Sequence, residues 1–363
     1  MKVVFHDLST KLKTVTDLET TARGGMVSSL FKVTDYLCGR GHEVIVFSDI
    51  EEPGWTKKGV FWTNVDKGFD DRGIRILVTN RGTGSGYSEL HAKHRVLWTH
   101  DLPHSGFIPE PDTIKAYSMT VFMSTYAQKI WKKFYKQIGP DTQIPNGVDE
   151  KLFYPRQKDF GYLIYCSHPN RGLGLLPYIF DAVSNRIGFD IKLRAYSSAK
   201  MYPNEGDMKD HIGDTLNLNY PEAKCEGYEQ LDPVPQHRLA EEIGKAGLMI
   251  MPSGYPEICS NSILQSIASG TPVITTGNLG SAKEWVINHW TGRLTEYTPA
   301  DYMVYIVEMV RMIVETLTDS VAHDRLLERV KNPGSYYGLG WNGRKVMTWN
   351  EVGEQWHRML CRL

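Results

Sequence analysis

A polar segment between an apolar run and a helix-period segment carries the residues best suited to bind a ligand. The run Leu248–Met251 predicts a buried strand, and Glu257 lies in the loop after it. A helix is expected to begin at Ser260, Asn261 and Ser262. The N–H groups at a helix N-terminus have no partner within the helix and can hold a phosphate, and a carboxylate beside them can accept hydrogen bonds from sugar hydroxyls. The alternative is that Ser260 or Asn261 only caps the helix.

Two further loop residues follow expected strands. Arg171 comes after the run Tyr162–Tyr165, and its planar guanidinium suits a bidentate grip on a diphosphate. The alternative is a surface arginine near a helix start. His100 comes after the run Arg95–Trp98, where it either faces a ligand or packs as a loop histidine. His100 and His104 are four residues apart, but Pro103 disfavours a helix there, so we expect no metal pair.

Two glycine-rich segments resemble nucleotide-binding motifs only in their letters. Gly338–Gly343 matches G-x-G-x-x-G, but no strand precedes it and no acidic residue follows in a β-α-β context. Gly82–Gly86 lacks the Lys-Ser/Thr ending of a P-loop. We therefore expect no dinucleotide site at the first segment and a loop at the second.

Strands alternate with helices along most of the chain, which predicts parallel sheets covered on both faces. The expected strands are Lys2–Phe5, Glu43–Phe47, Ile74–Val78, Arg95–Trp98, Met119–Met123, Tyr162–Tyr165, Ile191–Ala195, Leu248–Met251 and Pro272–Thr275. The expected helices run from Met26 to Gly39 and over Ala127–Ile138, Gly172–Val183, Leu239–Ala246, Ser260–Ser269 and Trp349–Leu360.

A turn-rich segment, IPNGVDEKLFYP, interrupts this alternation and marks the expected domain boundary. We therefore predict an α/β fold of two Rossmann-like domains. The first takes in residues 1–150 and a C-terminal helix within 341–363, and the second takes in residues 151–340. Ligands of such sheets bind at the carboxyl ends of the strands.

Composition limits the class of protein. The chain has 363 residues, with 41 Lys and Arg against 42 Asp and Glu, so its net charge of −1 disfavours binding to nucleic acid. The start of the chain lacks the apolar run of a signal peptide, and no run is long enough to span a membrane, so a cytoplasmic protein is expected. Free thiols are expected at the five scattered cysteines, Cys38, Cys166, Cys225, Cys259 and Cys361.

The segment PEICSNSILQSIASGTPVIT resembles the donor-site signature of retaining GT-B glycosyltransferases of glycosyltransferase family 4. In that signature one Glu contacts the donor sugar and a second, further along, binds the ribose diol. Glu257 matches the first, whereas Gln265 stands at the second position. A glutamine has one acceptor oxygen and an NH₂ donor, so we expect ribose binding to be weaker by about 1 kcal/mol.

The resemblance covers most of the chain, from the Gly-Gly helix followed by G-H-E-V, through P-N-G-V-D-x-x-x-F-x-P, to the closing helix that crosses back to the first domain. It implies a GT-B fold whose two parallel sheets face a central cleft. It implies His100, Arg171 and Glu257 as catalytic residues. The donor-binding residues it implies are Gly24, Gly25, Asp101, Ser167, His168, Gly172, Gly227, Tyr228, Gly254, Ser260, Asn261, Ser262 and Gln265.

The expected activity is therefore retaining transfer of a hexose from a nucleotide-diphosphate sugar, such as GDP-mannose or UDP-glucose, to a hydroxyl acceptor. The acceptor would be a glycan, free or linked to protein or lipid, and no cofactor or metal is expected. Rival interpretations are a nucleotide-sugar 2-epimerase, a catalytically weak sugar-nucleotide binding protein and a nicotinamide dehydrogenase. The segment 127–138 mixes lysines with aromatic residues, so it either contacts an anionic membrane or has a solvated lysine face over an aromatic core face.

Overall fold

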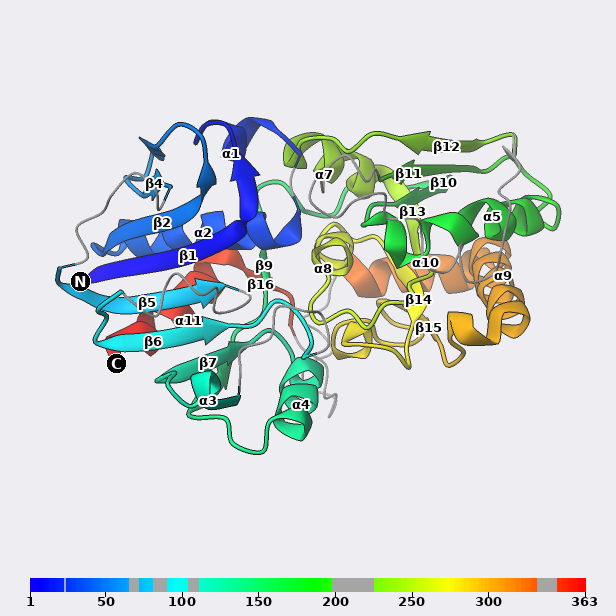
Figure 1. Cartoon of the computed structure of the whole chain (residues 1–363). Coiled ribbons are helices and arrows are strands. Elements are labelled where there is room, and N and C mark those ends of the chain that lie inside the picture. Colours follow the sequence, from blue (N-terminus) through cyan, green and yellow to red (C-terminus); the bar gives the residue numbers. More distant parts are fainter. Residues whose placement is uncertain (23, 65–71, 81–89, 104–110, 198–224, 332–344) are drawn as a thin grey trace. The chain divides into compact units, whose positions relative to one another are not determined.

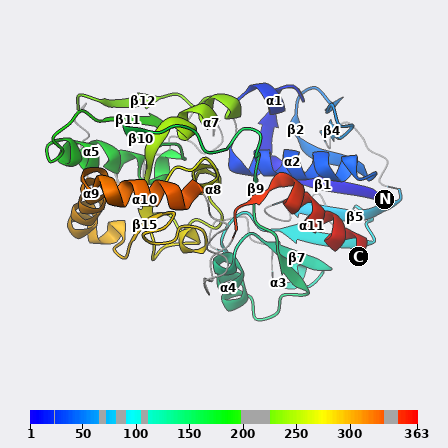
Figure 2. The same ribbon diagram turned by 180° about the vertical axis from the view of Figure 1, so that it is seen from behind.

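The computed structural model describes residues 1–22, 24–64, 72–80, 90–103, 111–197, 225–331 and 345–363 (Figure 1). The chain divides into two compact units. Unit 1 consists of Met1–Gly147 and Met347–Leu363, and unit 2 consists of Val148–Val346. Figure 2 shows the same ribbon from behind, with α11 packed in unit 1. Each unit is built around its own sheet.

Within the described residues, unit 1 forms an eight-stranded sheet in the order β3-β4-β2-β1-β5-β6-β7-β8, parallel except for the β3–β4 pair. The strands are β1 (Lys2–Leu12), β2 (Glu43–Ile50), β3 (Gly54–Trp55), β4 (Phe61–Thr63), β5 (Ile74–Asn80), β6 (His94–Trp98), β7 (Met119–Phe122) and β8 (Asp141–Gln143). The helices are α1 (Asp17–Thr20), α2 (Gly25–Gly39), α3 (Pro111–Ile114), α4 (Thr125–Phe134) and α11 (Trp349–Cys361).

Unit 2 contains a parallel six-stranded sheet among its described residues, in the order β12-β11-β10-β13-β14-β15. The strands are β10 (Asp159–Tyr165), β11 (Lys192–Tyr196), β12 (Tyr228–Leu231), β13 (Ala246–Met251), β14 (Val273–Thr276) and β15 (Gly292–Thr295). The α-helices are α5 (Leu176–Ser184), α7 (Gln236–Lys245), α8 (Asn261–Ala268), α9 (Tyr302–Thr318) and α10 (Ser320–Lys331). Where the chain passes between the units, β9 (Gly147–Val148) pairs with β16 (Met347–Thr348).

The predicted α/β class with parallel sheets is confirmed, and each predicted strand and helix has a counterpart. Some bounds differ for physical reasons. The helix expected from Gly172 begins at Leu176, because Gly172 adopts a left-handed φ of 89° between two 3-10 turns, Pro169–Arg171 and Leu173–Leu175. The helix expected to reach Ile138 ends at Phe134, because Tyr135 leaves helical geometry and is buried against Trp131 and Phe122.

The closing helix α11 is anchored in unit 1 by one bulky residue and one small one. Trp356 is fully buried, with its ring 4.7 Å from that of Trp98 and 6.1 Å from that of Phe5. Gly353 lets α2 approach, since a Cβ there would lie 2.2 Å from Cγ of Tyr36. The Tyr36 hydroxyl donates to Glu354 at 2.9 Å. A capping box between Thr348 and Glu351 fixes where the helix begins.

A half-buried lysine of unit 2 bridges the C-terminal ends of two helices. Lys158 Nζ donates to the carbonyl of Gly244 at 2.7 Å, to the carbonyl of Ser269 at 2.8 Å and to Oγ1 of Thr271 at 2.6 Å. These carbonyls lie at the C-termini of α7 and α8, where the helix dipoles favour a cation. The contact fixes α8, and with it the loop that precedes this helix.

Stability in acid is expected to depend on His6, a buried residue of β1. Its side chain is 3% exposed, and burial lowers its pKa from 6.5 to about 3. Between pH 6.5 and pH 3, His6 therefore binds a proton in the unfolded chain but stays neutral in the folded chain. The contribution of the neutral His6 to the free energy of unfolding is complete above pH 6.5 and is lost as the pH falls toward 3. We expect His6 to lower the free energy of unfolding by about 2 kcal/mol between pH 7 and pH 5.

Urea unfolding at pH 7 and pH 5 measures this effect. The His6→Asn variant should show a smaller loss between the two pH values than the wild type, and His237→Asn, which alters an exposed histidine, is the control. An equal loss in wild type and His6→Asn would contradict the prediction.

Candidate functional site

The candidate site of unit 2 is built on three neighbouring parallel strands. β10, β13 and β14 lie side by side in the sheet, so the loops that follow them emerge at one edge. Arg171 lies in the loop after β10, Glu257 in the loop after β13, and Gly280 in the loop after β14. The carboxyl edge of a parallel sheet is where such folds bind ligands.

Arg171 and Glu257 form an ion pair at this edge. Nε of Arg171 donates to Oε1 of Glu257, and the guanidinium lies 3.5 Å from the centre of the Tyr255 ring. The two charged side chains are only 17% and 14% exposed. Burial alone would lower the pKa of Arg171, but the Glu257 carboxylate raises it above its usual value, so the guanidinium stays charged. The arrangement places a fixed cation and a fixed carboxylate side by side.

Two glycines let the loops pack closely around this pair. At Gly172, next to Arg171, a Cβ would lie 2.0 Å from the carbonyl oxygen of Pro252, in the loop after β13. At Gly280, with a φ of 79°, a Cβ would lie 2.5 Å from the backbone nitrogen of Glu257. The N–H of Ser281 donates to the carbonyl of Glu257 at 2.7 Å. The backbone on both sides of the ion pair is therefore held by neighbouring loops.

The N-terminus of α8 follows the Glu257 loop directly. Ser260 is the N-cap residue, but its side chain makes no capping hydrogen bond and its hydroxyl instead faces Sδ of Met251 at 3.9 Å. Ser262 donates to the carbonyl of Cys166, and Asn261 is the first residue of the helix. Capping by Ser260, the alternative that the sequence left open, is thus not what the structure shows. Gly254 lies in the same loop, between Ser253 and Tyr255.

Ser167 and His168 shape the loop that carries Arg171. The His168 side chain accepts a hydrogen bond from the N–H of Asn170 at 3.2 Å and so caps the 3-10 turn Pro169–Arg171. The carbonyl of Ser167 accepts from the Ser197 hydroxyl at 2.6 Å. Both residues are half-buried next to Arg171, so the structure brings them to the candidate site in a positioning role.

Gln265 lies on α8 and is engaged by another glutamine. Its Nε2 donates to Oε1 of Gln236, at the start of α7, at 2.9 Å. The Gln265 side chain is 9% exposed. A carboxylate at this position would need the Gln236 amide to turn so that its NH₂ group donates instead.

Four predicted residues belong to unit 1. Gly24 is the N-cap of α2 and Gly25 its first residue, while His100 and Asp101 follow β6. The His100 ring lies 4.5 Å from the Trp98 ring, and the carbonyl of Asp101 accepts from Nε1 of Trp131 at 2.9 Å. Gly24 and Gly25 come after the carboxyl end of β1, with α1 between, and His100 and Asp101 come just after the carboxyl end of β6. In the sheet, β1 and β6 flank β5.

The structure separates Gly227 and Tyr228 from the other predicted residues of unit 2. Tyr228 is the first residue of β12, which pairs in parallel with β11, so both lie at the amino ends of the strands, opposite Arg171 and Glu257. Gly227 has a φ of 88°, and a Cβ there would lie 2.6 Å from the carbonyl oxygen of Ile191. Burial raises the pKa of Tyr228 to about 12. Backbone geometry and packing account for both residues, which corrects their assignment to donor binding.

Several other expectations concern other parts of the chain. His104, Gly82–Gly86 and Gly338–Gly343 lie outside the described residues. All five cysteines are described and are free thiols, as expected. In the segment 127–138, Trp131 of α4 and Tyr135 just after it belong to a core cluster of unit 1, as the alternative of an aromatic core face predicts, whereas Phe134 is 46% exposed. Among the described residues, no helix is long and apolar enough to cross a membrane.

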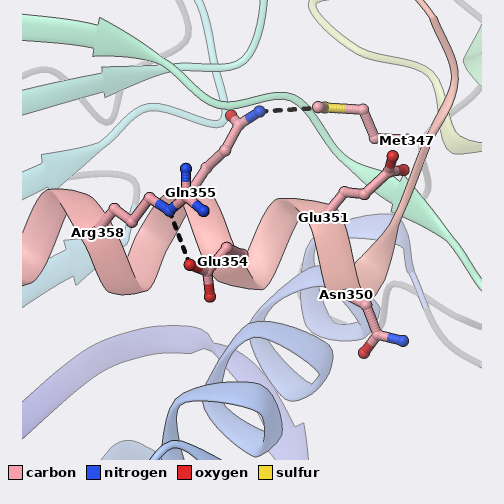
Figure 3. Close-up of a pocket in the computed structure, with 6 residues that line it drawn as sticks. All are labelled: Met347, Asn350, Glu351, Glu354, Gln355 and Arg358. Carbon is pink, nitrogen blue, oxygen red and sulfur yellow. Dashed lines mark hydrogen bonds and ion pairs between the residues drawn. The ribbon is translucent and has the colours of Figure 1, made fainter.

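Sequence reasoning missed Tyr255, Asn170 and Gly280. Asn170 Oδ1 accepts a hydrogen bond from Nη1 of Arg171, and the Tyr255 ring lies against the guanidinium. Gly280 packs against the backbone of Glu257. The pocket shown in Figure 3 is a separate feature on the surface of α11 in unit 1, where Arg358 bonds to Glu354 at 2.7 Å. It contains none of the residues predicted to bind a ligand.

Comparisons with known proteins show similarity at the level of structure. No family model and no curated protein sequence matches the chain. Sucrose-phosphate synthase from Thermosynechococcus elongatus is 14% identical with a TM-score of 0.74, covering 99% of this chain and 98% of that one. WaaG, a glycosyltransferase of lipopolysaccharide biosynthesis, is 12% identical with a TM-score of 0.66 and 99% of each chain covered.

Anabaena HepE in complex with UDP and glucose is 15% identical with a TM-score of 0.66, and 100% of each chain is covered. At this level of identity a likeness establishes the fold alone. Both sheets, their order along the chain and the return of the last helix to unit 1 are included in these full-length matches. The chain therefore has the GT-B glycosyltransferase fold.

Proposed function

We propose that this chain is a retaining, metal-independent hexosyltransferase that uses a nucleotide-diphosphate sugar. The observation that carries the proposal is the ion pair of Arg171 with Glu257 beside the N-terminus of α8. It offers a cation for a diphosphate and a carboxylate for sugar hydroxyls at one edge of the sheet. The GT-B fold supports a transferase, and the resemblance of the segment around Glu257 to a family 4 donor signature supports retention of configuration.

Each residue then has a chemical role. Breaking the anomeric C–O bond leaves positive charge on the sugar and negative charge on the diphosphate. Arg171 and the backbone N–H groups at the start of α8 stabilise the diphosphate, and Glu257 orients the sugar. For His100, which follows β6 in unit 1, the family resemblance is what suggests a contact with the sugar. We nominate no protein nucleophile, because the leaving phosphate can help to deprotonate the acceptor hydroxyl on the same face.

Donor binding must rearrange the ion pair. Without a donor, the carboxylate of Glu257 occupies the position beside the guanidinium that a phosphate oxygen would take. When the donor arrives, the diphosphate becomes the anion on Arg171, and sugar hydroxyls donate to Glu257. Neither charge is left unpaired in either state, which keeps the desolvation cost of the site low.

The proposed donor and acceptor classes have their own support. HepE was solved with UDP-glucose, which supports a donor of the UDP-glucose type, and GDP-mannose is the other leading candidate. The acceptor is proposed to be a hydroxyl of a glycan, free or linked to protein or lipid. For a lipid-linked acceptor, membrane contact would involve the exposed Phe134 and the neighbouring lysines of α4.

Calorimetric titration with GDP-mannose, UDP-glucose, UDP-N-acetylglucosamine and NAD tests the proposal. Saturable binding of one sugar nucleotide, followed by transfer of its hexose to an added acceptor with retained configuration by NMR, is the expected result. Epimerisation of UDP-N-acetylglucosamine without any acceptor would favour a 2-epimerase instead. Binding of NAD alone would contradict the proposal.

A sugar-nucleotide binding protein with slow turnover is the second candidate, and Gln265 favours it. The amide of Gln265 donates to Gln236 and cannot match the two-fold acceptor geometry that a carboxylate offers a ribose diol. We expect Gln265→Glu to strengthen donor binding by roughly fivefold, or about 1 kcal/mol.

Donor affinity and turnover are both measured in this variant, with Gln236→Ala as a control for the broken glutamine pair. A wild-type turnover near zero that rises strongly in Gln265→Glu would favour the binding protein over the transferase. An unchanged affinity in Gln265→Glu would place the ribose away from α8.

A further inference from the structure

Two histidines and a cysteine of unit 1 lie together at the end of α11. His42 immediately precedes β2, and His357 and Cys361 are one helical turn apart on α11. Nε2 of His42 lies 2.8 Å from Nδ1 of His357, and Sγ of Cys361 lies 3.9 Å from both ring nitrogens of His357. One ligand atom from each residue lies within 4.8 Å of the other two. The cluster therefore connects the turn before β2 to the last helix of the unit.

Helix α11 carries His357 and Cys361, and His42 lies in the tight turn between α2 and β2. His42 is 7% exposed at the corner between α2 and β2, where its N–H donates to the carbonyl of Leu37. His357 follows the buried Trp356 and is half-buried, and Cys361 is exposed. Sites built on rigid helices and strands keep their ligand geometry better than sites on loops. The cluster thus has a fixed inner ligand and an outer ligand open to solvent.

The donor atoms indicate the class of metal. Two imidazoles and a thiolate suit Zn²⁺ and exclude the hard ions Mg²⁺ and Ca²⁺, which prefer oxygen ligands. With Zn–N near 2.0 Å and Zn–S near 2.3 Å, tetrahedral ligand atoms lie about 3.3 to 3.6 Å apart. The His42–His357 spacing of 2.8 Å is shorter than that range and the His357–Cys361 spacing of 3.9 Å is longer, with all three ligand atoms within 4.8 Å of one another. Side-chain rotations would have to bring the three spacings into the tetrahedral range.

We propose that His42, His357 and Cys361 bind a zinc ion that ties the end of α11 to the start of β2. Three protein ligands leave a fourth position for water on the exposed side of Cys361. Zinc binds the neutral imidazole and the thiolate, so its affinity should fall as the pH is lowered. This site is independent of the proposed transfer, whose expected metal independence concerns the donor site of unit 2.

Cobalt substitution of the full chain tests the site directly. Co²⁺ bound to a thiolate in a tetrahedral site gives a near-ultraviolet charge-transfer band and intense visible bands. We expect both with the wild type and with Cys225→Ser, which alters a half-exposed thiol of unit 2. The charge-transfer band should be absent in Cys361→Ser, a change at an exposed position that leaves the core untouched.

Zinc affinity, measured by competition with a chromogenic chelator, gives the second readout. Loss of a ligand in Cys361→Ser or His357→Gln should weaken binding by at least the 10- to 100-fold typical of losing a partner outside the ligand sphere. Zinc should also raise the melting temperature of the wild type more than that of either variant. No charge-transfer band with the wild type, or an equal band and equal zinc affinity in Cys361→Ser, would overturn the proposal.

Discussion

Replacement of Arg171 by alanine is expected to weaken the binding of a nucleoside diphosphate by about 100-fold. A hydrogen bond to a charged group contributes about 1.5–3 kcal/mol, and the guanidinium, 17% exposed and held against Tyr255, loses little freedom on binding. Arg171→Lys keeps the charge but not the planar fork, so its loss should be smaller, roughly tenfold. Calorimetry with UDP and GDP, in addition to the sugar nucleotides, measures these losses.

Glu257→Gln is the matched variant, since it breaks the same ion pair from the other side. In Arg171→Ala the carboxylate is left 14% exposed without its cation, which destabilises the fold as well as the site. In Glu257→Gln the guanidinium is released from its competing anion, so the affinity for the free nucleoside diphosphate should hold or rise while hexose transfer falls. Equal losses of diphosphate affinity in both variants would mean that the pair is only structural.

The sequence predicts the two charged residues of the site but not the residues that surround them. Arg171 and Glu257 follow apolar runs that identify strands, and parallel strands bring the following loops to one edge. Tyr255 and Asn170 have no pattern of their own, because their contacts with Arg171 depend on loop geometry. Gly227 and Tyr228 resemble family residues in sequence, but strand direction places them at the opposite edge.

The fold shows the same division between strong periodic signals and local detail. Runs such as Val3–Phe5 and Leu248–Met251 are fully buried strands, as their composition indicates. Short edge strands such as β3 and β12 carry little apolar signal and were not predicted. Helix α9 was missed although Tyr305, Met309 and Ile313 recur on its buried face at helical spacing. In that case the information was present in the sequence.

Gly172→Ala is expected to destabilise unit 2 by about 3 kcal/mol or more. A Cβ at residue 172 would lie 2.0 Å from the carbonyl oxygen of Pro252, where the loops after β10 and β13 meet. The φ of 89° adds strain for any side chain. Backbone on both sides can only shift to relieve the clash, so the cost includes overpacking as well as strain.

Gly188→Ala is the matched control, because Gly188 has no atom within 4 Å of its Cβ position. Its effect should stay within about 0.5 kcal/mol in urea unfolding. Gly172→Ala should also lower donor affinity, since moving the Pro252 loop displaces Glu257 from Arg171. A variant as stable as the wild type would show that the two loops do not touch here. A destabilised variant with unchanged donor affinity would instead separate the loop contact from the binding site, and so remove the structural basis proposed for the site.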